Sequence, residues 1–163
     1  MVRSIAIGGF MGVGKTTVAR GVAEALGLPF CDLDDCVERM AGESIAQIFE
    51  RSGEATFRGL ESTALQNALS GSRVVLALGG GTLHAGQNCA FIQSRADLFC
   101  LSLPLAEIEQ RIGKTDPGRP LWDQSRNMLY ESRKPLFVSA GVFLDVSKMS
   151  VDQVVERIVE AVA

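Results

Sequence analysis

The stretch that decides the fold is residues 4–19, SIAIGGFMGVGKTTVA. Its centre, residues 9–16 (GFMGVGKT), matches the phosphate-binding pattern G-x-x-x-x-G-K-[ST] at every fixed position. The apolar run at residues 5–7 is typical of a buried parallel strand, and the glycines let bare backbone N–H groups approach a polyphosphate. A glycine-rich turn that matches by chance is the alternative, and the strand–loop–helix context disfavours it. We expect the helix that follows to point its positive end at an anion.

Two side chains of this loop carry chemistry beyond the backbone. Lys15 is placed to reach the outer phosphates of a nucleoside triphosphate, and Thr16 offers a hydroxyl to Mg²⁺. The loop therefore predicts a nucleoside triphosphate site, and it leaves open what happens to the last phosphate.

Length and charge limit the classes of function. The chain has 163 residues and a net charge of −3, with a pI of about 5.2, so we expect one domain and no overall basic surface for nucleic acid or an anionic membrane. No signal peptide is visible after Met1, and no apolar run approaches membrane-spanning length. A cytoplasmic location follows as an expectation.

The cysteines and the histidine give little sign of a metal site. Cys31, Cys36, Cys89 and Cys100 form no C-x-x-C pattern, and we expect them to be small buried residues in a reducing compartment. His84 is the only histidine, which nearly excludes a His-based metal site or catalytic triad, so a surface or helix-start position is the simpler interpretation.

Strand and helix patterns alternate along the whole chain. Strands are expected at residues 5–7, 30–34, 73–78, 98–103 and 142–146, with helices between them and a closing helix at 151–162. Ser44 with Gln47 forms a candidate capping box, and Ser150 is a candidate cap of the closing helix. A short helix is expected at 37–41, a helix break at Ser52-Gly53, and a helix at 121–138 that is broken or kinked near Pro135. This alternation predicts an α/β fold with a parallel sheet. Residues 113–120 (GKTDPGRP) are polar and rich in turn formers, which predicts a mobile loop.

Two acids follow the second expected strand. If residues 30–34 stay extended, Asp32 and Asp34 face the same side and project into the crevice at the carboxyl end of the sheet, where the phosphate loop also opens. Asp32 would then join the Mg²⁺ shell, and Asp34 would orient an acceptor hydroxyl or accept its proton. Capping of the next helix by Asp34 or Asp35 is an equally weighted alternative.

Arginines and glycines supply further candidates. Arg58 lies at helical spacing from Glu54 and Glu61, so either a solvated surface pair or an arginine steered toward an anionic substrate is possible. Three consecutive glycines at residues 79–81 suggest close approach of the backbone to a ligand. Arg119 lies in the turn-rich loop and would bring charge over a transferring phosphoryl group. For Arg111, Arg119 and Arg133 the alternative is a solvated surface charge, and for Phe49 and Phe57 it is the core.

Six segments together resemble the shikimate kinases, which share the nucleoside monophosphate kinase fold. In chain order they are GFMGVGKTT, LGLPFCDLDD, SIAQIFERSGEATFRGLES, LALGGGT, GRPLW and ESRKPLF. The resemblance runs nearly end to end. It implies a single three-layer P-loop kinase domain over residues 1–163, with a five-stranded parallel sheet in the order 2-3-1-4-5. It also implies a substrate-binding region at about 34–62 and a mobile lid at about 112–124.

The resemblance implies ATP:shikimate 3-phosphotransferase activity with Mg²⁺. Lys15, Asp34 and Arg119 would be catalytic, Asp34 as general base and Arg119 as the lid arginine, while Thr16 and Asp32 would hold the metal. The nucleotide would contact Gly12, Val13, Gly14, Lys15, Thr16, Thr17, Arg111 and Arg119. Shikimate would contact Asp34, Phe49, Phe57, Arg58, Glu61, Gly79, Gly80, Gly81 and Arg133. In this set Arg58 and Arg133 would grip the carboxylate, with Glu61 orienting Arg58.

Two other functions remain as alternatives. A gluconate-type sugar-acid kinase on the same fold also needs a carboxylate grip, but that family's markers after the second strand are missing. A nucleotide-dependent switch without an acceptor would leave Arg58 and the three glycines unexplained, and no N-K-x-D base-reading motif is present. We expect a monomer whose partner is the small-molecule substrate.

Overall fold

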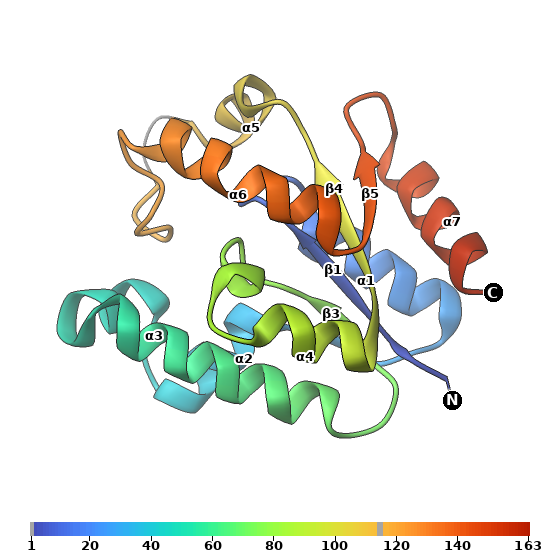
Figure 1. Ribbon diagram of the computed structural model, residues 1–163, viewed down its shortest axis with the longest axis horizontal. Coiled ribbons are helices and arrows are strands. Elements are labelled where there is room, and N and C mark those ends of the chain that lie inside the picture. The colour runs from blue at the N-terminus through green and yellow to red at the C-terminus, as the bar shows by residue number, and fades with distance from the viewer. Residues whose placement is uncertain (1, 114–115) are drawn as a thin grey trace.

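The strands form one parallel sheet, as the sequence predicts. A computed structural model describes residues 2–113 and 116–163, and within them the five strands run in the order β2-β3-β1-β4-β5. The central strand β1 pairs with β3 on one side and with β4 on the other, with Ile7 opposite Ala77 and Phe99. Every pairing is parallel, so all the strands end at the same edge, where Figure 1 shows α5 and the kinked start of α3 on either side.

The elements alternate along the described chain. In order they are β1 (Ser4–Gly9), α1 (Lys15–Leu26), β2 (Phe30–Asp32), α2 (Leu33–Ala41), α3 (Ile45–Leu69), β3 (Val75–Ala77), the 3₁₀ turn η1 (Thr82–His84), α4 (Asn88–Arg95), β4 (Ala96–Ser102), α5 (Leu105–Ile112), α6 (Arg126–Ala140), β5 (Val142–Asp145) and α7 (Val151–Val162).

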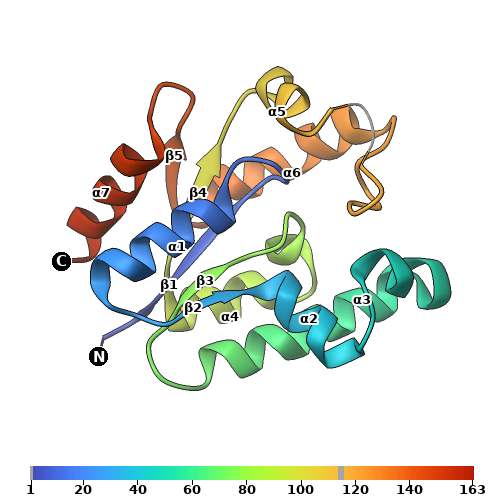
Figure 2. The same cartoon turned by 180° about the vertical axis from the view of Figure 1, so that it is seen from behind.

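Helices cover both faces of the sheet, which gives three layers. Figure 1 shows α4 and α6 on the near face, and Figure 2, from behind, shows α1 and α7 on the other. The central strand is buried along its whole length, as expected for a strand covered on both faces. The predicted capping box of Ser44 with Gln47 is confirmed, and so is the cap of α7 at Ser150, which the structure shows to be a capping box with Gln153.

The second strand is shorter than the sequence predicts. It ends at Asp32, and α2 begins at Leu33. Asp32 is the N-cap, because its Oδ1 accepts from the backbone N–H groups of Asp34 and Asp35. The expectation that Asp32 and Asp34 share one face of an extended segment is therefore wrong, and so is capping by Asp34 or Asp35: Asp34 lies in the first turn of a helix.

The sequence predicts interruptions in two helices, and the structure shows a break in one of them. The predicted break near Gly53 is confirmed, because Gly53 has φ 81° and ψ 173° inside α3, a backbone conformation that glycine adopts freely. The sequence also predicts a break or a kink near Pro135, and no break occurs there, because α6 runs from Arg126 to Ala140 with Pro135 inside it. Tyr130 and Phe137 of α6 are buried in the core, and this packing stabilises the helix despite the missing N–H of proline.

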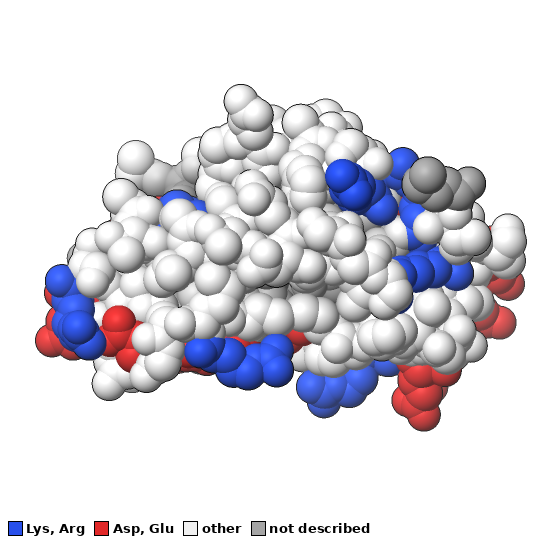
Figure 3. Space-filling model, turned by 90° about the horizontal axis from the view of Figure 1, so that it is seen from below, with Lys and Arg blue, Asp and Glu red and all other residues white. Residues whose placement is uncertain are grey.

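Three further predictions concern the surface charge, membrane-spanning helices and the burial of the cysteines. Figure 3 shows Lys and Arg in small separate groups, with Asp and Glu between them, on the face seen from below. In the part of the chain that the structure describes, no helix combines the length and apolar character needed to cross a membrane. The prediction of buried cysteines is correct for Cys100 and wrong for Cys31, Cys36 and Cys89, which are partly exposed.

Candidate active site

One cleft lies beyond the carboxyl ends of the strands and has a volume of about 470 Å³. The phosphate loop, α2, the kinked helix α3, the glycine turn after β3, and the segment after α5 all contribute to its walls. Among the predicted residues, its lining includes Gly12, Gly14, Lys15, Thr16, Thr17, Asp32, Asp34, Phe49, Phe57, Arg58, Glu61, Gly79, Gly80, Gly81, Arg111, Arg119 and Arg133. Val13 is the exception, because its side chain is buried in the core.

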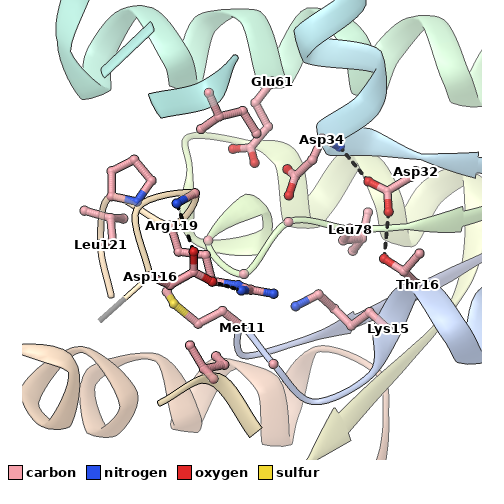
Figure 4. Close-up of a pocket in the computed structure, with 18 of the residues that line it drawn as sticks. Met11, Lys15, Thr16, Asp32, Asp34, Glu61, Leu78, Asp116, Arg119 and Leu121 are labelled. Carbon is pink, nitrogen blue, oxygen red and sulfur yellow. Dashed lines mark hydrogen bonds and ion pairs between the residues drawn. The ribbon is translucent and has the colours of Figure 1, made fainter. Parts of the chain in front are cut away.

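Lys15 stands at the floor of the cleft. Its Nζ donates to the carbonyls of Gly9 and Phe10, at 2.8 and 2.9 Å, so the loop folds around its own lysine. Burial lowers the pKa of Lys15 to about 8, although Asp34 opposes this shift. Figure 4 shows Lys15 and Arg119 pointing into the same space. An anion bound between them would meet two cations.

Thr16 and Asp32 form an oxygen-rich corner beside Lys15. The Thr16 hydroxyl donates to Asp32 Oδ2 at 2.7 Å, while Oδ1 of the same carboxylate caps α2 at 3.0 Å from the Asp34 nitrogen. The cap orients the carboxylate and leaves one oxygen facing the cleft side (Figure 4). Among the described residues, no group of three or more His, Cys, Asp or Glu side chains is arranged to hold a metal by itself.

Asp34 lies between the two halves of the cleft. Burial, with a further contribution from the nearby Asp32 charge, raises the pKa of Asp34 to about 6, while Lys15 opposes the rise. A Cβ atom on Gly79 would lie 3.1 Å from Asp34 Oδ1 and 2.9 Å from Glu61 Oε2. Glycine at this position therefore leaves room for both carboxylates beyond the carboxyl end of β3.

Glu61 orients Arg58 from a fully buried position. Its side chain is 0% exposed, and Oε1 accepts from Arg58 Nη1 at 2.7 Å while Oε2 accepts from Thr82 Oγ1 at 2.8 Å. Arg58 also contacts Glu54 at 3.4 Å and stacks over the Phe57 ring. Arg58 lines the cleft and pairs there with the buried Glu61, so the solvated surface pair is wrong, while the contact with an anionic substrate stays a prediction.

Arg133 meets Arg58 at the glycine turn. A Cβ atom on Gly81 would lie 2.5 Å from Arg58 Nη2 and 2.7 Å from Arg133 Nη2. Burial and the Arg58 charge lower the pKa of Arg133 to about 10, so the Arg133 guanidinium is still charged at neutral pH. Two cations held this close form a site for a carboxylate, since an anion between them removes their repulsion.

The remaining predicted residues lie at the rim. Phe49 and Phe57 pack against each other with ring centroids 4.9 Å apart, and both line the cleft as well as touching the core. Arg111 is the side chain nearest to Gly14, because its Nη1 lies 3.8 Å from the position of a Cβ there. Arg111 therefore stands over the phosphate loop.

Arg119 belongs to the segment after α5, which the sequence predicts to be a lid. Lys114 and Thr115 of this segment lie outside the described residues. Arg119 pairs with Asp116 (Figure 4), and the Trp122 Nε1 donates to the Gly113 carbonyl at 2.9 Å, which joins the two ends of the segment. Residues 121–125 precede α6 instead of belonging to it, because Asp123 accepts from the Ser125 backbone N–H at 2.8 Å in a local turn.

Sequence reasoning missed two residues of this site. Asp116 holds Arg119, and Thr82 holds Glu61. The spacing of three residues between Asp116 and Arg119 is a signal that was available in the sequence. Thr82 follows the third glycine directly, but nothing in the sequence indicates that its hydroxyl meets a carboxylate from α3.

Comparisons with known proteins identify the family. The shikimate kinase family model matches residues 11–163. A shikimate kinase from Caldanaerobacter subterraneus subsp. tengcongensis is 36% identical over 165 residues, covering 98% of this chain and 96% of the relative. The structure of a shikimate kinase from Acinetobacter baumannii in complex with shikimate superposes with a TM-score of 0.93 at 32% identity, covering 99% of this chain and 93% of that chain.

A gluconokinase structure from Sinorhizobium meliloti also superposes, with a TM-score of 0.66 at 16% identity, covering 99% of this chain and 91% of that one. A likeness at this identity shows a common fold and nothing more. The family model and the relatives cover nearly the whole chain. This chain therefore belongs to the shikimate kinase family and is a kinase with the P-loop fold.

Proposed function

We propose that this enzyme transfers the γ-phosphoryl group of ATP to the 3-hydroxyl of shikimate, giving shikimate 3-phosphate and ADP. The observation that carries the proposal is the meeting of Arg58 and Arg133 at Gly81, across the cleft from Lys15, with Asp34 between the two halves. A small acid that carries hydroxyl groups matches this arrangement. The complex of the Acinetobacter baumannii relative with shikimate supports the choice of acid.

ATP occupies the half of the cleft formed by the phosphate loop. The backbone N–H groups of residues 12–17 (Gly12, Val13, Gly14, Lys15, Thr16 and Thr17) cradle its phosphates, and Val13 takes part through its backbone alone. Lys15 neutralises the outer phosphates, since its Nζ is already held at the floor of the cleft by two loop carbonyls. Arg111, beside Gly14, packs against the adenine. Helix α1 adds its positive end to the same anion.

Mg²⁺ is held by Thr16 and Asp32 in this proposal. The donor set fits the ion, because Mg²⁺ takes oxygen ligands and usually keeps several waters and phosphate oxygens beside one or two protein groups. The Thr16 hydroxyl and Asp32 Oδ2, 2.7 Å apart, are such a pair. When bound, the ion neutralises charge that develops on the phosphates.

The acceptor occupies the other half. Arg58 and Arg133 bind its carboxylate, Glu61 holds Arg58 in place, and Phe49 and Phe57 close the apolar side of the ring. Asp34 accepts the proton of the attacking hydroxyl. Its pKa of about 6 suits a base near neutral pH, because the carboxylate is ionised there and still basic enough to help.

Arg119 completes the charge around the transferring group. It lines the same cleft as Asp34 and is held by Asp116 until a phosphate competes for it. Phosphoryl transfer depends on positioning and on neutralising charge. We propose that residues 112–124 act as a lid and that residues 34–62 form the substrate-binding region of one catalytic domain. The enzyme acts as a cytoplasmic monomer without a nucleic acid or membrane partner.

A coupled assay of ADP release tests the proposal. We expect turnover with shikimate, none with gluconate and none without an acceptor, and we expect EDTA to abolish it and Mg²⁺ to restore it. Equal ADP release with and without shikimate would refute the transfer reaction. Activity that persists in EDTA would refute the metal role.

Matched arginine variants test the carboxylate grip. Arg58→Ala or Arg133→Ala should abolish shikimate turnover while ATP binding survives. Arg51→Ala is the control, because Arg51 lies on the same helix α3 as Arg58 but pairs with Glu43 outside the cleft. Unchanged activity in the Arg58 and Arg133 variants would contradict their role.

A further inference from the structure

Two cysteines lie side by side next to the proposed metal corner. The Sγ atoms of Cys31, on β2, and Cys36, on α2, are 2.9 Å apart. Both side chains are partly exposed, so a small reagent can reach them. In the described chain no other sulfur–sulfur contact of this kind occurs, since Cys100 is buried on β4 and Cys89 lies on α4. The five-residue spacing of the pair is not a C-x-x-C motif, and the sequence pattern alone does not reveal it.

Cys36 has the surroundings of a reactive thiol. Arg39 Nη2 donates to Cys36 Sγ at 3.4 Å. Cys36 is also the fourth residue of α2, so it lies close to the positive end of that helix. The thiolate is the nucleophile in exchange with disulfides, and the 2.9 Å contact places the Cys31 sulfur next to the one that would be attacked second. Cys31 is the adjacent thiol that completes the exchange.

The pair encloses the residues that matter most to the proposed reaction. Asp32 and Asp34 lie between Cys31 and Cys36 in the chain, and Asp32 joins the end of β2 to α2 through its cap. A covalent bond between the two sulfurs would close a short ring around both acids. A disulfide bond is about 2.05 Å long, so the two sulfurs, now 2.9 Å apart, would be drawn together, and the bond would restrain the first turn of α2, which carries Asp34, against β2.

We propose that Cys31 and Cys36 are a modification site that forms a reversible internal disulfide by exchange with a low-molecular-weight disulfide, and that the oxidised enzyme turns over more slowly. The effect on turnover rests on the proposed roles of Asp32 and Asp34. The Cys36 thiolate attacks one sulfur of glutathione disulfide, and the first glutathione leaves as a thiolate. Cys31 then attacks the Cys36 sulfur, gives up its proton to solvent and displaces the second glutathione. Two protein thiols are oxidised, and one disulfide is reduced to two thiols.

The first experiment tests the bond itself. The full-length protein is equilibrated with mixtures of reduced and oxidised glutathione, alkylated and analysed by peptide mass spectrometry. We expect an internal disulfide between Cys31 and Cys36 that dithiothreitol reverses, and the same bond in the Cys89→Ser control. Only a stable glutathione adduct on either residue, or two free thiols at full oxidation, would overturn the proposal.

The second experiment tests the consequence. In the coupled ADP assay, oxidised wild type and Cys89→Ser should lose at least about tenfold in kcat/KM for shikimate and recover with dithiothreitol. Cys31→Ser and Cys36→Ser should be insensitive to oxidation, and Cys36→Ala serves as a second variant if a serine destabilises the fold. Equal loss in these variants, or a formed disulfide with unchanged kinetics, would overturn the effect on turnover. If the reduced protein fails to use shikimate, the proposed function fails, while the peptide analysis still decides whether the bond forms.

Discussion

Replacing Gly81 with alanine tests the acceptor site through the space between its two arginines. Gly81 has φ −117° and ψ 5°, a conformation with negative φ that alanine also adopts, so the backbone itself resists the change little. The added methyl group would lie 2.5 Å from Arg58 Nη2 and 2.7 Å from Arg133 Nη2. Both guanidinium groups must therefore move, and nothing else near Gly81 is as close.

The size of the effect follows from these distances. Comfortable contact between heavy atoms begins at about 3.5 Å, so each guanidinium group must retreat by about 1 Å. A misplacement of about 1 Å costs on the order of 100-fold in rate, which is about 2.7 kcal/mol of transition-state stabilisation. We expect kcat/KM for shikimate to fall by about this factor, while the affinity for ATP stays unchanged because the phosphate loop is untouched.

Steady-state kinetics with shikimate as the varied substrate measures this loss, and nucleotide titration measures ATP binding. Gly59→Ala is the matched control, because Gly59 adjoins Arg58 on α3 and no atom lies within 4 Å of its added Cβ. This control should keep full activity and gain about 0.5–1 kcal/mol in stability, since it replaces a glycine within a helix. A Gly81→Ala enzyme with unchanged kcat/KM would refute a carboxylate held between Arg58 and Arg133.

Three further results are expected. Burial and the Asp32 charge raise the pKa of Asp34 to about 6, so its carboxylate takes up a proton as the pH falls through that value. We therefore expect kcat/KM for shikimate to drop about tenfold per pH unit below pH 6. A flat pH–rate profile would contradict the role of Asp34 as the base. Trp122 lies at the end of the proposed lid, so its fluorescence should respond to ATP or ADP, and a flat titration at saturating nucleotide would count against the lid. Tyr130→Phe removes the 2.8 Å hydrogen bond to the Leu103 carbonyl and should lower the stability by about 1 kcal/mol. A thermal melt should show a fall in Tm of about 2–4 °C. An unchanged Tm would show that water replaces the hydroxyl.

Local patterns predicted most of the fold. The capping box at Ser44, the helix cap at Ser150 and the break at Gly53 follow from residues that are neighbours in the chain, and all three are confirmed. The start of α2 was placed too late, because the Asp32 carboxylate caps two backbone N–H groups and so begins the helix at Leu33. The competing strand pattern at residues 30–34 was a weaker signal than this cap.

The acceptor half of the cleft could be predicted only as a set of candidates. The sequence left Arg58 open between a surface pair and a substrate contact, and helical spacing alone supports both. The structure rules out the solvated surface pair, because Glu61 is fully buried and Thr82 donates to it from another element, while the substrate contact stays a prediction. The nearness of Cys31 to Cys36 depends likewise on how α2 packs against β2.

The sequence by itself determined the donor half of this enzyme. In the proposed function residues 9–16 would bind phosphates through consecutive backbone N–H groups and one lysine, so the order of residues along the chain is sufficient to specify the site. The tertiary structure alone decided the acceptor half. Asp34, Arg58, Gly81 and Arg133 come from four separate elements, and only the packing of α2, α3 and α6 around the glycine turn brings their side chains within reach of one small molecule.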